Sequence, residues 1–185
     1  MSMIADHSRE KLINAINYFA RNTKYCGKTK LFKLLYFLDF EHFKVTGRSV
    51  TGLDYFAWPK GPVPKSLQEE IPKPNADLAA SVKFLEKQTA KSPMIVPTPV
   101  AAFENSKFSK RELKLMESIA NRHKNDLADD MIEATHLENL PWDTIYNKQR
   151  KQQELIPYDL AILRQEKDEV TALSAESREI KANYR

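Results

Sequence analysis

Histidines and carboxylates are the first residues in this sequence that could do chemistry, because they bind metal ions and transfer protons. Glu133 and His136 stand three positions apart, the spacing used in di-iron helix bundles, and Asp39 stands close to His42. A di-iron site needs two such motifs and two further carboxylates, whereas each of these pairs is isolated. None of the histidines has the neighbours of a zinc site. We therefore predict no metal and no cofactor.

Covalent catalysis has one candidate nucleophile, the single cysteine Cys26. Lys24 and Lys28 flank it and could lower its pKa, but we favour a small, half-buried residue at the end of a helix. The sequence has no Gly-x-Ser-x-Gly elbow and no glycine-rich phosphate loop, and four glycines leave little room for one. We predict that the protein is not an enzyme. An unrecognised active site at the Glu133 or Asp39 pair is the alternative.

Nucleic acid is a further alternative as a ligand. Lys24, Lys28, Lys30 and Lys33 stand beside aromatic residues, a combination that binds single strands. The formal net charge of +4 is mild for a dedicated nucleic-acid-binding protein. A single thiol excludes a disulfide framework, the first residues lack the apolar region of a signal peptide, and no apolar run could span a membrane. We therefore expect a cytoplasmic protein with no membrane partner.

The elements that must position these residues begin with two helices. Apolar residues recur at helical spacing in residues 8–22 and 29–46, with Ser8 and Thr29 as predicted N-caps and Gly47 as the terminating residue. The second helix carries two apolar stripes, where a surface helix normally has one. It is therefore buried on most sides or keeps one side for a partner. The stripes consist of Leu31, Leu34, Leu35 and Leu38, and of Phe32, Tyr36, Phe40 and Phe43.

The period changes after Gly47. Residues 49–58 favour a strand or hairpin arm, and the three prolines and one glycine of residues 59–64 predict a rigid, extended turn. A short helix is predicted at residues 65–70. Residues 82–86 and 94–100 are predicted strands of a small antiparallel sheet, in which prolines confine the second strand to an edge.

The second half of the chain is again helical. Ser109 and Glu112 fit a capping box, and further helices are predicted after Asp126, at Pro141 and near Tyr158. The predicted fold class is mainly α, of the α+β type. A compact helical domain with a small antiparallel β-sheet or hairpin occupies residues 8–163. A charged C-terminal helical tail with a sparse apolar stripe follows at residues 164–185.

Two groups of residues in a fixed order carry a family resemblance. The first is the segment 30–43, which reads KLFKLLYFLDFEHF, followed by Tyr55, Trp58 and the GPVP turn at residues 61–64. The second contains Thr135-His136, Pro141-Trp142 and Ile156-Pro-Tyr158. Together they resemble the Panacea domain of SocA-like antitoxins and phage-associated GepA-type proteins over residues 8–163. Residues 164–185 lie outside the family pattern.

The resemblance implies an antitoxin encoded beside a toxin in a bacterium or prophage, which binds and neutralises that toxin. Delivery of the toxin to the protease ClpXP, as known for SocA, and nucleic-acid-binding regulation are the alternatives. The predicted partner-binding residues combine the family motif with residue types common at binding hot spots: Lys33, Tyr36, Phe40, Tyr55, Trp58, Gly61 and Pro62. His136 and Trp142 are predicted to be structural, as a buried imidazole and an aromatic plug under the Gly-Pro turn.

Overall fold

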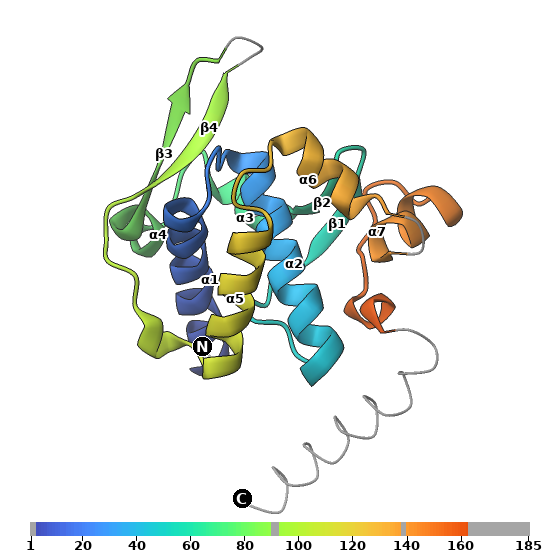
Figure 1. Ribbon diagram of the computed structural model, residues 1–185, viewed down its shortest axis with the longest axis horizontal. Coiled ribbons are helices and arrows are strands. Elements are labelled where there is room, and N and C mark those ends of the chain that lie inside the picture. The colour runs from blue at the N-terminus through green and yellow to red at the C-terminus, as the bar shows by residue number, and fades with distance from the viewer. Residues whose placement is uncertain (1–2, 90–92, 138–139, 163–185) are drawn as a thin grey trace, which may run out of the picture.

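The computed structural model describes residues 3–89, 93–137 and 140–162. In this part of the chain, helices surround one central helix, α2, and two small hairpins flank them (Figure 1). The α-helices are α1 (Met3–Asn22), α2 (Lys28–Thr46), α3 (Lys65–Glu70), α4 (Ala76–Ser81), α5 (Lys110–Arg122), α6 (Ala128–Thr135) and α7 (Pro141–Asp143). Short helices of other pitch are η1 (Asn105–Lys107), η2 (Thr144–Lys148) and η3 (Tyr158–Ala161). The strands are β1 (Tyr55–Trp58), β2 (Gly61–Pro64), β3 (Val82–Lys87) and β4 (Met94–Pro99). The predicted mainly helical α+β class is confirmed.

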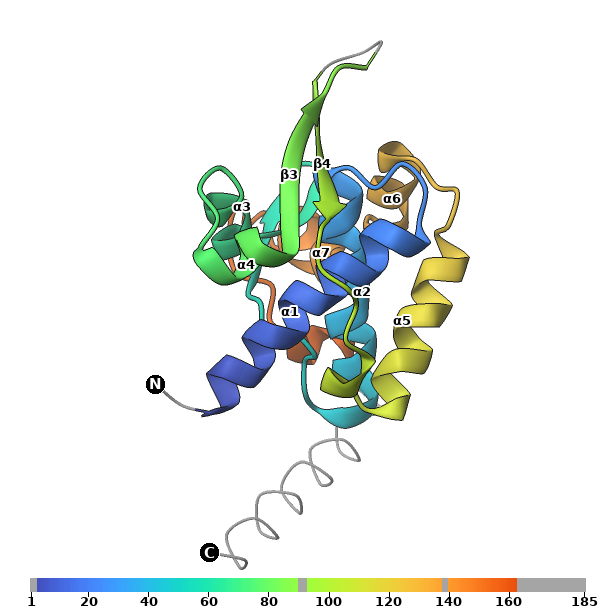
Figure 2. The ribbon, with the colours of Figure 1, turned by 90° about the vertical axis from the view of Figure 1, so that its left-hand side faces the viewer.

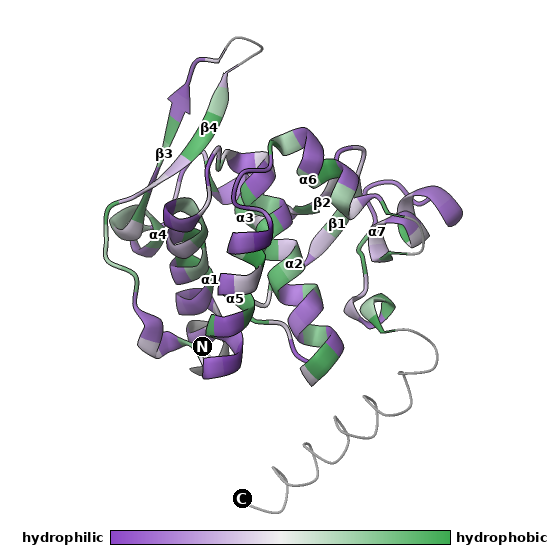
Figure 3. Ribbon diagram, in the orientation of Figure 1, coloured by the Kyte–Doolittle hydropathy of each residue, from purple (hydrophilic) through white to green (hydrophobic). Residues whose placement is uncertain are grey.

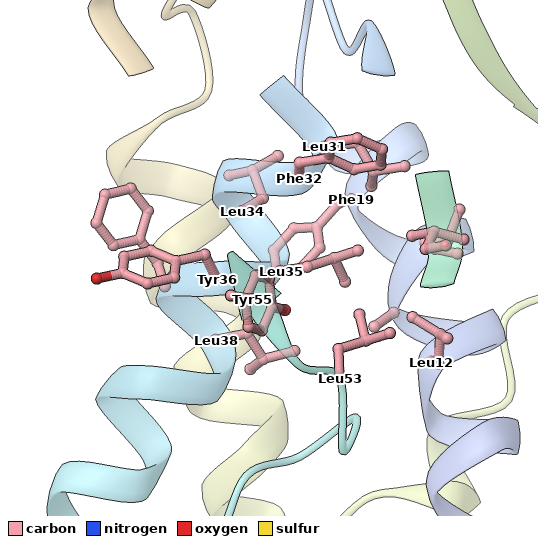
Figure 4. Close-up of a cluster of buried hydrophobic side chains, with 14 of the residues drawn as sticks. Leu12, Phe19, Leu31, Phe32, Leu34, Leu35, Tyr36, Leu38, Leu53 and Tyr55 are labelled. Carbon is pink, nitrogen blue, oxygen red and sulfur yellow. The ribbon is translucent and has the colours of Figure 1, made fainter. Parts of the chain in front are cut away.

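Helix α2 is the centre of the core because it is buried on almost every side. Every residue from Lys30 to Phe40 is buried, so the two apolar stripes mainly reflect burial. Figure 4 shows the leucines of α2 packed towards Phe19 of α1 and towards Leu53. The aromatic stripe contacts Tyr55, whose ring centroid lies 5.6 Å from that of Tyr36. Burial of each large apolar side chain contributes about 1.5–3 kcal/mol.

The predicted C-terminus of α2 is confirmed. Gly47 has a left-handed conformation with φ of 67°, and its N–H donates to the Phe43 carbonyl. The predicted N-caps are wrong. Gly27, rather than Thr29, precedes α2, and α1 begins at Met3, so Ser8 lies inside the helix. No proline or glycine precedes Ser8 that would stop the helix from extending towards the N-terminus.

The capping box at α5 is confirmed. The Glu112 backbone N–H donates to the Ser109 hydroxyl, and the Ser109 backbone N–H donates to the Glu112 carboxylate. Asp126 does not cap α6. Leu127 occupies that position, and the Asp126 carboxylate is instead 2.8 Å from Nδ1 of His123. The Asp126 carboxylate was predicted to cap α6, but it contacts the imidazole of the buried His123 and does not cap the helix.

The strands form two separate antiparallel hairpins, which agrees with the predicted small antiparallel sheet or hairpin. In the first, Tyr55 pairs with Pro64 and Trp58 with Gly61, so only Pro59 and Lys60 form the turn. The predicted extended turn over residues 59–64 is therefore too long, since four of these residues form strand β2. Prolines are tolerated in β2 because β2 pairs with a strand on one side only and needs few backbone N–H donors.

The second hairpin confirms the two predicted strands. Val82 pairs with Pro99 and Lys87 with Met94. Figures 1 and 2 show this hairpin projecting beyond the helices. Helix α4, directly before the hairpin, was not predicted.

Figure 3 shows hydrophilic residues over much of α1 and α5. Across the described ranges, no helix combines the length and apolar character needed to cross a membrane.

A buried carboxylate fixes the chain between α2 and β1. Asp39 is completely buried and accepts hydrogen bonds from the backbone N–H groups of Val50 and Thr51, from the Thr51 hydroxyl and from the Tyr55 hydroxyl. Burial raises the pKa of Asp39, whereas these four hydrogen bonds act to lower it. The carboxylate thus satisfies donors that the loop after α2 and Tyr55 of β1 would otherwise leave unpaired in the core.

Replacement of Asp39 tests this role. Asp39→Ala should lower the free energy of unfolding by about 3–5 kcal/mol, because it leaves several buried donors without an acceptor. Urea denaturation followed by circular dichroism measures the loss. Asp54→Ala, at an exposed carboxylate in the same loop, should change stability by no more than about 0.5 kcal/mol. Similar small losses in both variants would contradict the structural role of Asp39.

Candidate protein-binding site

The two sequence signatures meet at a buried lysine. The side chain of Lys33 on α2 is 1% exposed, and its ammonium donates a hydrogen bond of 2.8 Å to the Pro62 carbonyl of β2. Thr135 at the end of α6 closes the same spot from the other side, and it is completely buried. Among the described residues, Lys33 has no carboxylate partner, and burial lowers its pKa from 10.5 to about 7.

Gly61 is required where these three elements converge. A Cβ atom at this position would lie 2.7 Å from the Thr135 hydroxyl and 2.8 Å from the Lys33 ammonium nitrogen. Its φ of +91° is a conformation that other residues adopt only with strain. The glycine therefore allows β2 to approach α2 and α6 closely enough for the Lys33 hydrogen bond to form.

An aromatic stack packs beside the β1–β2 hairpin. The rings of His136 and Trp142 are stacked with centroids 3.7 Å apart, and Tyr146 continues the stack at 4.6 Å from Trp142. The Trp142 indole N–H donates to the Trp58 carbonyl at 2.9 Å. Nε2 of His136 is buried without a hydrogen bond, and burial together with the charge of Lys33 lowers the pKa of this imidazole. In this arrangement the His136 imidazole packs against the face of the Trp142 ring, and Trp142 lies beside the β1–β2 turn.

The last part of the second signature covers the free edge of β1. Ala57 donates its N–H to the Glu154 carbonyl at 2.9 Å, and Ile156 donates to the Tyr55 carbonyl at 2.8 Å. Tyr158 then stacks on Phe40 of α2, with centroids 4.5 Å apart. Both signatures are therefore joined through β1 and the second half of α2.

An apolar groove opens beside this junction. It has a volume of about 460 Å³ and lies between α2, the end of α5, the α6–α7 segment and η3. Its apolar lining consists of Tyr36, Phe37, Phe40, Ala134, Leu137, Leu140, Pro141, Leu160 and Ala161, and its polar lining of Glu41, Lys44, Arg122 and His123. Leu137 is 60% exposed, so the groove presents a large apolar side chain to solvent.

The floor of the apolar groove contains two unsatisfied polar atoms. The Tyr36 hydroxyl and Nε2 of His123 are buried and have no hydrogen bond of normal geometry. Figure 4 shows the Tyr36 ring pointing away from the leucines of the core, on the side of α2 that faces the groove. Buried polar groups without a partner are rare in cores, and two of them lie at this groove.

The structure separates the predicted partner-binding residues into three environments. Tyr36 and Phe40 line the apolar groove. Lys33 and Trp58 line a second depression on the hairpin side. Gly61, Pro62 and Tyr55 are buried, and Tyr55 is 0% exposed, so a partner cannot touch the Tyr55 side chain in this conformation.

Other candidate sites from the sequence do not assemble on the surface. Lys30, like Lys33, is buried, and its ammonium donates to the carbonyls of Lys24 and Asp126, so half of the predicted basic cluster points inward. Burial raises the pKa of Cys26 to about 11, which disfavours a reactive thiolate. Within the described part of the chain, no group of three or more potential metal-ligating side chains comes together.

Several site residues escaped the sequence analysis. Leu137 and Leu140 follow α6 and form one wall of the apolar groove, and Leu160 forms another. A usable signal was present, because Leu137 is a large apolar residue placed just beyond the helix end, where polar residues are expected. Lys30 belongs to the predicted basic cluster, but its side chain joins the loop after α1 to the loop after α5.

Fold and site together define a mainly helical protein whose central helix joins the two sequence signatures and borders an apolar groove. The model for the family described as antitoxin SocA-like, Panacea domain, matches residues 31–143, and the chain belongs to this family. The matched region contains the Lys33, Gly61 and Trp142 junction and ends before Ile156. Comparison with curated proteins and with solved structures gave no match.

Replacement of Gly61 tests the close approach at the junction. Gly61→Ala should lower the free energy of unfolding by about 2–4 kcal/mol, because backbone strain adds to a clash with Thr135 and Lys33. Gly52→Ala is the matched control, since Gly52 also has a positive φ, of 72°, but a Cβ there would lie 3.4 Å from its nearest neighbour. It should cost about 1 kcal/mol. Equal losses in urea denaturation would show that the approach to Lys33 is unimportant.

The lowered pKa of Lys33 predicts a pH-dependent stability. Between about pH 7 and 10 the unfolded chain holds a proton on Lys33 that the folded chain lacks, so the free energy of unfolding rises with pH. The stability of the wild type relative to Lys33→Met should therefore increase by about 1.4 kcal/mol per pH unit in this window. The exposed Lys83→Met serves as control and should give no such slope. A constant difference between wild type and Lys33→Met would contradict the buried, deprotonating lysine.

Proposed function

We propose that this protein is an antitoxin that binds a protein toxin encoded beside it and neutralises the toxin by holding it. Membership of the SocA-like Panacea family is the observation that carries the proposal. The apolar groove supports it, because an exposed leucine and aromatic residues at the junction of the two signatures form a surface suited to another protein.

We further propose that the protein acts by binding and not by catalysis. The candidate pairs from the sequence are occupied by structural contacts: the Asp39 carboxylate accepts hydrogen bonds from the following loop, and Nδ1 of His42 lies 2.7 Å from the Arg48 carbonyl. His136 stacks on Trp142, while Glu133 is exposed. These side chains therefore serve the fold, which supports a role without chemistry of its own.

The apolar groove is the proposed toxin contact. Its aromatic floor belongs to α2, and its walls come from α6–α7 and η3, so partner binding would connect elements that are distant in sequence. The floor is held by the stacks of Phe37 on His123 and of Phe40 on Tyr158. Such a preorganised surface loses little conformational entropy when a partner binds.

Co-expression with the open reading frame next to the gene tests the proposed function. Expression of that neighbour alone should stop bacterial growth, and the protein should restore growth and co-purify with the neighbour's product. A neighbour that is harmless alone, or that stays toxic in the presence of this protein, would refute the antitoxin function.

A substitution in the apolar groove tests the proposed contact. Leu137→Asp should weaken toxin binding by more than about tenfold, because a charge must lose its hydration where an apolar contact was made. Folding should be preserved, since Leu137 is 60% exposed. Leu85→Asp on β3, at a leucine that is 45% exposed and outside the groove, is the matched control. Titration calorimetry measures both; equal affinities would exclude the groove as the contact.

A further inference from the structure

A second depression lies on the hairpin side of α2, which we call the lysine slot. It has a volume of about 310 Å³ and is lined by Lys28, Thr29, Phe32, Lys33, Trp58, Pro59, Lys60, Val63 and Gln68. Phe32 and Val63 are buried, Trp58 is half-buried, and Lys60 is exposed. The walls are therefore apolar, whereas the charged groups belong to lysines alone.

The charges of the lysine slot lack compensation. Three of its lining residues are lysines and none is acidic. In the described ranges Lys28 and Lys60 form no ion pair, and the Lys33 ammonium donates to a carbonyl and not to a carboxylate. Burial lowers the pKa of Lys33 to about 7. A carboxylate brought to the slot would favour the charged form of each of these amino groups.

The apolar walls are fixed before any ligand arrives. The Trp58 carbonyl accepts the hydrogen bond of the buried Trp142 indole, and Pro59 follows directly in the tight turn of the β1–β2 hairpin. Val63 belongs to β2, which Lys33 ties to α2 through the Pro62 carbonyl. Trp58 is thus a half-exposed tryptophan on a rigid support, which is the type of residue that dominates binding interfaces.

We propose that the lysine slot receives an acidic segment of the bound protein, with an aromatic or branched apolar side chain between Phe32, Trp58 and Val63 and an adjacent carboxylate at Lys28 and Lys60. This assignment rests on the proposed function, in which the chain holds another protein, and it adds a contact separate from the apolar groove. Apolar walls select the side chain, and the uncompensated lysines select its acidic neighbour.

A small probe tests the slot without the toxin. N-acetylphenylalanine carries an aromatic ring and a carboxylate, and N-acetylphenylalaninamide is its neutral match. Titration into the full-length ¹⁵N-labelled protein should shift the Trp58 indole N–H and the Lys28 and Val63 amides, while the buried Trp142 indole stays unchanged. The carboxylate should bind about threefold to tenfold more tightly than the amide, and added salt should remove the difference. Equal binding of both probes, or no shifts at the slot, would overturn the proposal.

Charge reversal tests the slot in the complex. The double variant Lys28→Glu and Lys60→Glu should bind the toxin at least about tenfold more weakly, because like charges then face the acidic segment. Its fold should be kept, since Lys60 is exposed and a glutamate suits the first turn of α2. Lys73→Glu with Lys83→Glu makes the same charge change at exposed lysines outside the slot and should leave the affinity unchanged.

The outcomes separate this inference from the antitoxin function. If the wild-type protein does not bind the neighbour's product, the antitoxin function fails, whereas the probe titration still reports on the slot. If the wild type binds and the slot double variant binds equally well, the slot assignment fails alone. Displacement of N-acetylphenylalanine by a short oligothymidylate at low salt, without displacement by an acidic peptide, would assign the slot to nucleic acid and overturn the proposal.

Discussion

The hydrogen bond from the Lys33 ammonium to the Pro62 carbonyl is the contact on which the arrangement of the other elements depends. It requires β2 to lie almost against α2, and this approach is possible because Gly61 has no side chain. The same short distance brings Thr135, and with it the end of α6, onto the hairpin. Burial of an amine with a single hydrogen-bond acceptor costs free energy. The fold keeps this destabilising group at the place where its two signatures meet.

Burial of α2 on nearly all sides explains the other polar groups of the core. A helix in this position brings its lysines and its aspartate inside, and each must find a partner there. Lys30 donates to the carbonyls of two loops, and Asp39 accepts from the loop that follows α2. These side chains act as connectors between segments and not as surface charges. Their removal would leave backbone groups unpaired, which is more costly than the loss of a surface ion pair.

The lysine slot lies along the first half of α2 and the apolar groove along its second half, and the two have different chemistry. The apolar groove combines aromatic rings with an exposed leucine, whereas the lysine slot combines apolar walls with uncompensated amino groups. Both use residues of α2, and the lysine slot also uses residues of the β1–β2 hairpin, which the Lys33 contact and the Trp142 indole hold in place. A protein that binds another protein at both surfaces would gain affinity from the first and selectivity from the second.

The sequence by itself determined the long helices, the C-terminus of α2 and the N-terminus of α5, because apolar periodicity, the glycine at position 47 and the Ser109 capping box act locally. It also indicated both hairpins and the family to which the chain belongs. It misplaced the N-terminal caps and read residues 59–64 as a turn, since a strand of alternating prolines is recognisable only once β1 lies beside it. Only the tertiary structure decided which residues of α2 line a groove. Tyr36 and Tyr55 are equivalent as residue types, yet one lines a groove and the other has no exposed surface, because exposure depends on the elements packed around them. For the same reason Lys30 and Lys33 looked like surface charges in the sequence and lie in the core of the protein.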